Sequence, residues 1–110
     1  MKRASCIRAI RCVGDPKARV SKILVGPGYA TPRMTPEVDV VIGGDQQEAD
    51  GGFDNVEYVM DAASLGIAKG VIVLGRVVSE QAGMEDCAKW LRTFVHGVPI
   101  QFVPAEEPFW

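Results

Sequence analysis

The sequence of residues 38–48 is VDVVIGGDQQE, and this stretch decides the fold: a short apolar run ends in two glycines and then in acidic residues. A second stretch, GVIVLGRVVSE at residues 70–80, repeats that order. Runs of this length that are apolar on both faces are typical of strands in a parallel sheet covered by helices. The carboxyl ends of neighbouring parallel strands meet at one crevice, so we expect a ligand site there.

Two helices are expected around these strands. The first begins near Asn55, because Asp54 and Glu57 have capping-box spacing, and it stops at Gly66. The second carries apolar residues three and four positions apart and ends at Gly97. Its apolar positions are Met84, Cys87, Ala88, Leu91, Phe94 and Val95. Each pattern predicts a helix with one face turned to a core.

Two more strands are expected, at residues 20–25 and 99–103, with a Gly-Pro-Gly turn at 26–28 after the first. We interpret that turn as a simple turn and not as a phosphate cradle, because Pro27 has no N–H and no helix follows at once. The order of elements implies right-handed crossovers. The sequence therefore predicts an α/β fold: a single layered domain with a short, mostly parallel or mixed sheet and two main helices.

A chain of 110 residues, of which 47% are hydrophobic, is long enough for one core and too short for two comfortable domains. We expect one domain over residues 1–110, with residues 1–19 as a basic arm or edge strand. No apolar run is long enough for a membrane helix and no targeting segment is evident, which predicts a soluble, cytoplasmic protein. Three cysteines without metal-site or redox-pair spacing are expected to be reduced thiols.

Charge is unevenly distributed along the chain. Residues 1–22 hold seven of the twelve Lys and Arg residues and one acidic residue, a local charge of +6, whereas the remainder carries five basic and thirteen acidic residues, or −8. The basic segment contains no aromatic residue on which a base could stack. Nucleic acid is therefore an unlikely partner, and a solvated arm lying against the acidic body or a neighbouring subunit is the favoured interpretation.

Three carboxylates are the candidates for the crevice, namely Asp45, Glu48 and Glu80. Carboxylates suit hard divalent cations such as Mg²⁺ or Mn²⁺, and one of them could instead act as a general base. Acidic loop residues are more often simply solvated, and Glu80 could equally be a favourable first-turn carboxylate of the second helix. Arg76 lies between the strand end and Glu80, so the charge of the crevice depends on it.

Several short motifs, taken in order, resemble one known family. They are DVVIGGDQQE at 39–48, DAASLG at 61–66, GRVVSE at 75–80, Gly83-Met84, Trp90-Leu91 and the expected strand near 98–103. Residues 20–28 resemble the strand and glycine turn that precede this region. Residues 20–110 thus resemble the C-terminal half of the Nif-three-like dinuclear metal-binding family, whose members are often labelled GTP cyclohydrolase homologues.

The resemblance implies an α/β fold of two intertwined similar halves, assembly into toroidal hexamers, and a dinuclear metal site. Family ligands are a His-His pair and an aspartate in the N-terminal half, and the His and Glu of a Gly-His-x-x-x-Glu motif in the C-terminal half. Glu80 matches that glutamate and is the candidate metal ligand, whereas Arg76 occupies the histidine position. Asp45 and Glu48 match an acidic loop beside the site. The N-terminal half has no counterpart here.

Arg76 changes what the site can do, since arginine is a permanent cation with five donors and no lone pair to give a metal. It is better suited to an ion pair with Glu80 or to recognition of a carboxylate or phosphate. The leading expectation is a module with an incomplete metal site that self-assembles or binds a small anionic ligand through Asp45, Glu48 and Arg76.

Two other readings of the sequence stay open. The chain could be a divalent-metal-dependent hydrolase of the GTP cyclohydrolase-like type, with its ligands completed by another chain. It could also be a fragment of a longer protein or one member of a split pair, in which case the missing N-terminal half supplies the remaining ligands. The sequence therefore leaves open whether the chain is an enzyme, and it predicts either a homo-oligomer or a complex with that half.

Overall fold

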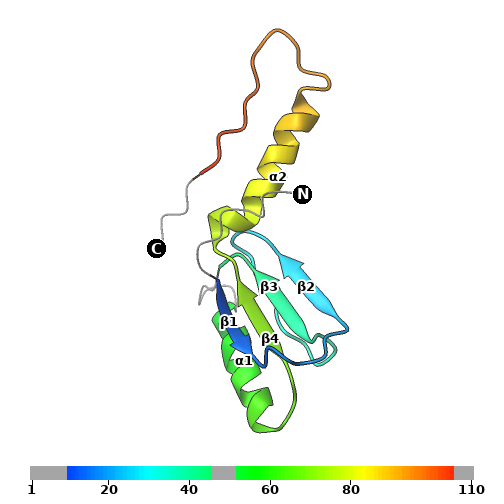
Figure 1. Ribbon diagram of the computed structural model, residues 1–110, viewed down its shortest axis with the longest axis vertical. Helices are drawn as coiled ribbons and strands as arrows, with labels where there is room; N and C mark the ends of the chain where they lie inside the picture. Colours follow the sequence, from blue (N-terminus) through cyan, green and yellow to red (C-terminus); the bar gives the residue numbers. More distant parts are fainter. Residues whose placement is uncertain (1–9, 46–51, 106–110) are drawn as a thin grey trace.

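A computed structural model of the protein describes residues 10–45 and 52–105 (Figure 1). It contains a small sheet, one helix packed on that sheet and a second helix that extends beyond it. The elements in chain order are β1 (Arg11–Gly14), β2 (Ile23–Gly26), β3 (Val40–Gly43), α1 (Gly52–Ser64), β4 (Gly70–Val73) and α2 (Arg76–Leu91).

The four strands form a mixed sheet in the order β1-β4-β3-β2. Strands β2, β3 and β4 are parallel, and β1 pairs with β4 in the antiparallel sense. The predicted α/β fold with a short mixed sheet and two main helices is therefore confirmed. Residues 11–14 provide the edge strand that was one of the two expectations for the N-terminal segment, while residues 1–9 lie outside the described residues.

Successive side chains of a strand point to opposite faces of the sheet, and the core lies on one of these faces. Leu24, Val41 and Val71 lie side by side in the strand register, and the last two are fully buried. The α1 residue Val59, only 1% exposed, packs into the same cluster as Val41 and Val71. Burying a valine of this kind is worth about 2 kcal/mol. The core therefore lies between the sheet and α1.

A buried side chain of α1 explains why this helix begins earlier than predicted. Asn55 is 1% exposed; its Oδ1 accepts the amide N–H of Met34 at 2.6 Å, and its Nδ2 donates to the carbonyl of Pro32 at 2.9 Å. It therefore ties the connecting loop to the helix interior and does not mark the helix start. Helix α1 begins at Gly52, which places Asp54 in the first turn, where a carboxylate favours the helix dipole.

The predicted strand at residues 99–103 is wrong, because these residues belong to no strand in the structure. A strand following α2 would need a free place beside β4, and β1 already occupies that side. Helix α2 also ends at Leu91, earlier than the predicted stop at Gly97, and residues 92–94 form a turn. The chain then runs back beside α2 (Figure 1).

Within the described ranges, no helix is long and apolar enough to cross a membrane. Cys12 and Cys87 are both free thiols. The net charge of the whole chain is −2.

Candidate functional site

The candidate site lies where β2, β3 and β4 end and α2 begins. Backbone hydrogen bonds carry the sheet to this edge: the amide of Gly44 donates to Gly26 at 3.2 Å, and that of Leu74 donates to Gly43 at 3.0 Å. The three parallel strands therefore finish at one level, with the loops after them side by side (Figure 1). This is the edge at which open α/β sheets bind ligands.

Two glycines let these loops approach each other and α2 closely. A side chain at Gly44 would collide with the backbone of Gly28 and with the Ser79 Oγ, and Gly28 itself has a φ of 79°. Ser79 joins the parts: its Oγ accepts the amide N–H of Gly28 at 2.8 Å and donates to the carbonyl of Arg76 at 2.7 Å. Only glycine fits such contacts at low cost.

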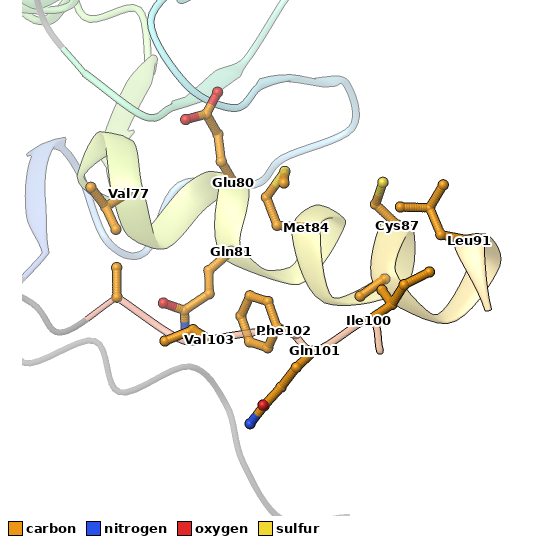
Figure 2. A pocket seen from close by; sticks show the side chains of 12 residues that line it. Val77, Glu80, Gln81, Met84, Cys87, Leu91, Ile100, Gln101, Phe102 and Val103 are labelled. Atoms are coloured by element: carbon orange, nitrogen blue, oxygen red, sulfur yellow. The ribbon is translucent and has the colours of Figure 1, made fainter. Parts of the chain in front are cut away.

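Glu80 lies against the same turn. A Cβ atom built on Gly28 would collide with the Glu80 Oε1 and lie 2.8 Å from its Cδ. Figure 2 shows the Glu80 carboxylate pointing away from residues 100–103 and toward the loops of the sheet. The glycine turn was interpreted from sequence as a simple turn, and the structure adds that it forms one wall of the candidate site.

Arg76 is the first residue of α2 and is exposed. Its Cζ lies 5.3 Å from the centroid of the Tyr29 ring, within range of a cation–π interaction. Among the described residues no carboxylate lies within 4.0 Å of its guanidinium, so an ion pair with Glu80 is absent there. The cation therefore retains N–H donors for another group.

The start of α2 adds to the positive potential around Arg76. The N-cap residue is Gly75, so no side chain caps the helix. The first turn of α2 also contains no acidic residue. The first amides of a helix need partners from outside it, and the helix dipole is positive at this end. Small anions bind well at such an end when a cation stands beside it.

Asp45 lies next to Gly44, and its carbonyl accepts a hydrogen bond from the hydroxyl of the buried Thr31 at 2.5 Å. This contact fixes the backbone of the acidic loop at the edge of β3. Glu48, the other predicted residue of this loop, lies outside the described residues. The structure thus brings Arg76 and Glu80 to one turn of α2 and anchors Asp45 on the adjoining loop.

Three residues of this region were not singled out from sequence, namely Tyr29, Thr31 and Ser79. Ser79 lies inside the GRVVSE motif, so its spacing from Glu80 was a usable signal. Tyr29 follows the glycine turn directly, but only the fold places its ring under Arg76. Thr31 gives no sequence signal, because a single threonine in a proline-containing loop has no pattern to distinguish it.

The residues described around Glu80 do not form a metal centre. Within residues 10–45 and 52–105, no three His, Cys, Asp or Glu side chains come together as a group that could hold a metal ion. Arg76, which precedes Glu80 by four residues on α2, is a permanent cation and repels a metal ion. A centre involving Glu80 would therefore need ligands from elsewhere.

Comparisons with protein-family models, with curated proteins and with solved structures found no match to this chain.

Proposed function

We propose that this chain is a Nif-three-like module that binds a small anionic ligand at the edge of the sheet and assembles with further copies of itself. One observation carries the ligand part of the proposal. Arg76 stands at a helix N-terminus that has no side-chain cap, beside two glycine-containing loops, and makes no ion pair among the described residues. This combination suits a phosphate or carboxylate group.

The neighbouring side chains restrict the ligand. The Tyr29 ring holds the Arg76 guanidinium by its face, which leaves in-plane N–H groups for a bidentate contact. Glu80 lies against Gly28 of the glycine turn, and a carboxylate there disfavours a highly charged anion. We therefore propose a ligand with one anionic group and a hydroxyl or amine that donates a hydrogen bond to Glu80.

Phosphate titration of the purified chain tests this site. Arg76→Gln should weaken the binding of inorganic phosphate, followed by calorimetry, by about tenfold or more, because it removes a charge-assisted contact. Lys17→Gln is the control, because it removes the same charge at the other end of the sheet. Lys17 follows Gly14, which pairs with Gly70 at the start of β4. This variant should bind phosphate as well as the wild type does. Equal loss in both variants would indicate a general charge effect and contradict the site.

The competing proposal is a divalent-metal-dependent hydrolase of the GTP cyclohydrolase-like type. It is supported by the position of Glu80, whose carboxylate lies at the strand edge and forms no ion pair within the described residues. Its remaining ligands would have to come from another chain, either a second copy or a separate N-terminal half.

Metal analysis separates the two proposals. If the chain, alone or with a copurified partner, holds about one tightly bound divalent ion per subunit and Glu80→Ala removes it, the metal-dependent reading is correct. Arg76→His is a sharper test, because it replaces a cation that repels metal ions by a side chain that can bind one. Under the metal-dependent proposal, this variant should bind the divalent ion more tightly than the wild type. Under the anion-binding proposal, the wild-type chain retains no such ion and the binding of phosphate does not depend on added Mg²⁺.

A further inference from the structure

One face of the sheet carries apolar side chains and has no described helix on it. The register places Cys12, Ile72, Ile42 and Val25 in one row across the four strands, with Ile23 and Val40 on the same face. This open face is opposite to the one covered by α1, and Val25 and Ile23 are 65% and 50% exposed. Contiguous apolar surfaces of this kind usually mark an interaction site.

Helix α2 presents a second apolar surface that its own chain covers only in part. Met84 is 58% exposed, and within α2 only Ala88 is buried. The helix and the returning segment form the two sides of an apolar groove of about 390 Å³, with Met84 on α2 and Ile100 and Phe102 on the segment (Figure 2). Val77, which is also exposed, lines the same groove.

The shape of the molecule shows that these two surfaces do not cover each other within one chain. Helix α2 points away from the sheet along the longest axis (Figure 1), and the molecule measures 60 × 32 × 28 Å. Its radius of gyration is 16.7 Å. A compact domain of this length has a radius of gyration of about 13 Å. The excess comes from α2 and the segment beside it.

We infer that a second copy of this chain covers the open face, with α2 of each copy packed on the open face of the other. This inference rests on the self-assembly proposed above and names its surfaces. The sixteen residues of α2 span about 24 Å, enough to cross the four-residue strands, which are about 13 Å long. A stable interface of standard size buries about 800 Å² on each copy, and two reciprocal helix–sheet contacts contribute two apolar surfaces to it.

The open face is uncharged, and the charges toward the end of α2 are paired, although Glu80 also lines the groove. The six residues of the open face are all uncharged, and the charged side chains of α2 near its end pair with one another, Lys89 with Glu85 at 3.2 Å and with Asp86 at 2.9 Å. An apolar row on the sheet and an apolar stripe on a helix are the two surfaces that a helix–sheet layer requires.

Sedimentation analysis at about 10 to 100 µM tests the inference. The wild type should be a dimer, and Val25→Lys and Met84→Lys should each be monomeric with an unchanged circular dichroism spectrum. Leu65→Lys places the same charge at a 76% exposed residue outside both surfaces and should remain dimeric. If Val25→Lys does not fold, Met84→Lys decides, because Met84 lies on the projecting helix.

Thiol labelling gives an independent measure of the open face. In a chain with Cys6 and Cys87 replaced by alanine, Cys12 on β1 should react with a maleimide at least tenfold more slowly in the dimer than in the Met84→Lys monomer. A wild-type chain that is monomeric throughout this range would overturn both self-assembly and this inference. A dimer that survives both lysine substitutions would overturn only the exchange of α2.

Discussion

The two helices of this protein have similar lengths, 13 residues in α1 and 16 in α2, and very different surroundings. Helix α1 buries Asn55 and Val59 against the loop and the sheet, whereas α2 buries only Ala88 and projects from the sheet edge (Figure 1). An apolar stripe at helical spacing therefore predicts the helix and its apolar face. It does not predict which surface covers that face.

The contrast between the two helices predicts the largest loss of stability for a substitution at Asn55 in α1. Asn55→Ala should lower the free energy of unfolding by about 3 kcal/mol, because the Met34 N–H and the Pro32 carbonyl lose their partner in a buried place. Urea denaturation measures this change. Glu57→Ala, at an exposed position of the same helix, should cost less than about 0.5 kcal/mol. Similar losses in both variants would contradict the tethering role of Asn55.

The next effect compares the apolar faces of the two helices directly. Val59→Ala should cost about 2 kcal/mol, because it removes two methyl groups from a side chain that is 1% exposed. Met84→Ala should cost less than about 1 kcal/mol in the dissociated chain, since more than half of Met84 is in water. Thermal unfolding at low protein concentration measures both. A larger loss at Met84 would place α2 in the core.

Acid should weaken the contact between Asp39 and the loop before β2. The backbone amides of Lys22 and Ser21 donate to Asp39 and lower its pKa below the ordinary value of 3.8, with Lys69 adding to the effect. A lowered folded pKa means a contribution to stability that is complete above the unfolded pKa and is lost as the pH falls through the folded one.

The slope of stability between about pH 5 and pH 2 should therefore flatten in Asp39→Asn. Glu37, whose pKa is lowered by a hydrogen bond from Thr35, should retain part of the slope. Denaturant titrations of the wild type and of Asp39→Asn at several pH values supply these slopes, and an equal slope in the two chains would refute the assignment.

The smallest effect concerns a half-buried amide side chain on α2, that of Gln81. The Oε1 of Gln81 on α2 is buried and makes no hydrogen bond within the described part of the chain. Replacing an unpaired polar atom by an apolar group removes a desolvation penalty. Gln81→Leu should therefore leave stability unchanged or raise it by up to about 1 kcal/mol, as measured by thermal unfolding. A loss comparable to that of Asn55→Ala would show that the two amides are equivalent.

Much of the fold followed from local patterns. The apolar runs that became β2, β3 and β4 were recognised to within three residues at each end, and both helices were expected. The strand at 99–103 was wrongly predicted because an extended apolar segment looks the same with or without a neighbour to pair with. The start of α1 was missed because a capping pattern cannot reveal that Asn55 faces inward.

Some residues of the candidate site were likewise predicted from the sequence, and others were found only in the structure. Asp45, Glu48, Arg76 and Glu80 were selected because each follows a strand, and the convergence of strand ends is a property of the fold class. Ser79 and Tyr29 were recognised only in the structure, since their contacts join α2 to a loop about fifty residues earlier in the sequence. The predicted alternative of an Arg76–Glu80 ion pair gave way to a cation–π contact with Tyr29.

The sequence by itself determined the α/β class and the position of Arg76 just after a strand end, because strand and helix periodicity and residue chemistry are local properties. Only the tertiary structure decided that β1 occupies the far side of β4, that α2 leaves the sheet, and that no helix among the described residues covers the second sheet face. Each of these features is set by which surfaces pack against each other. They depend on contacts between distant segments, which no local pattern encodes.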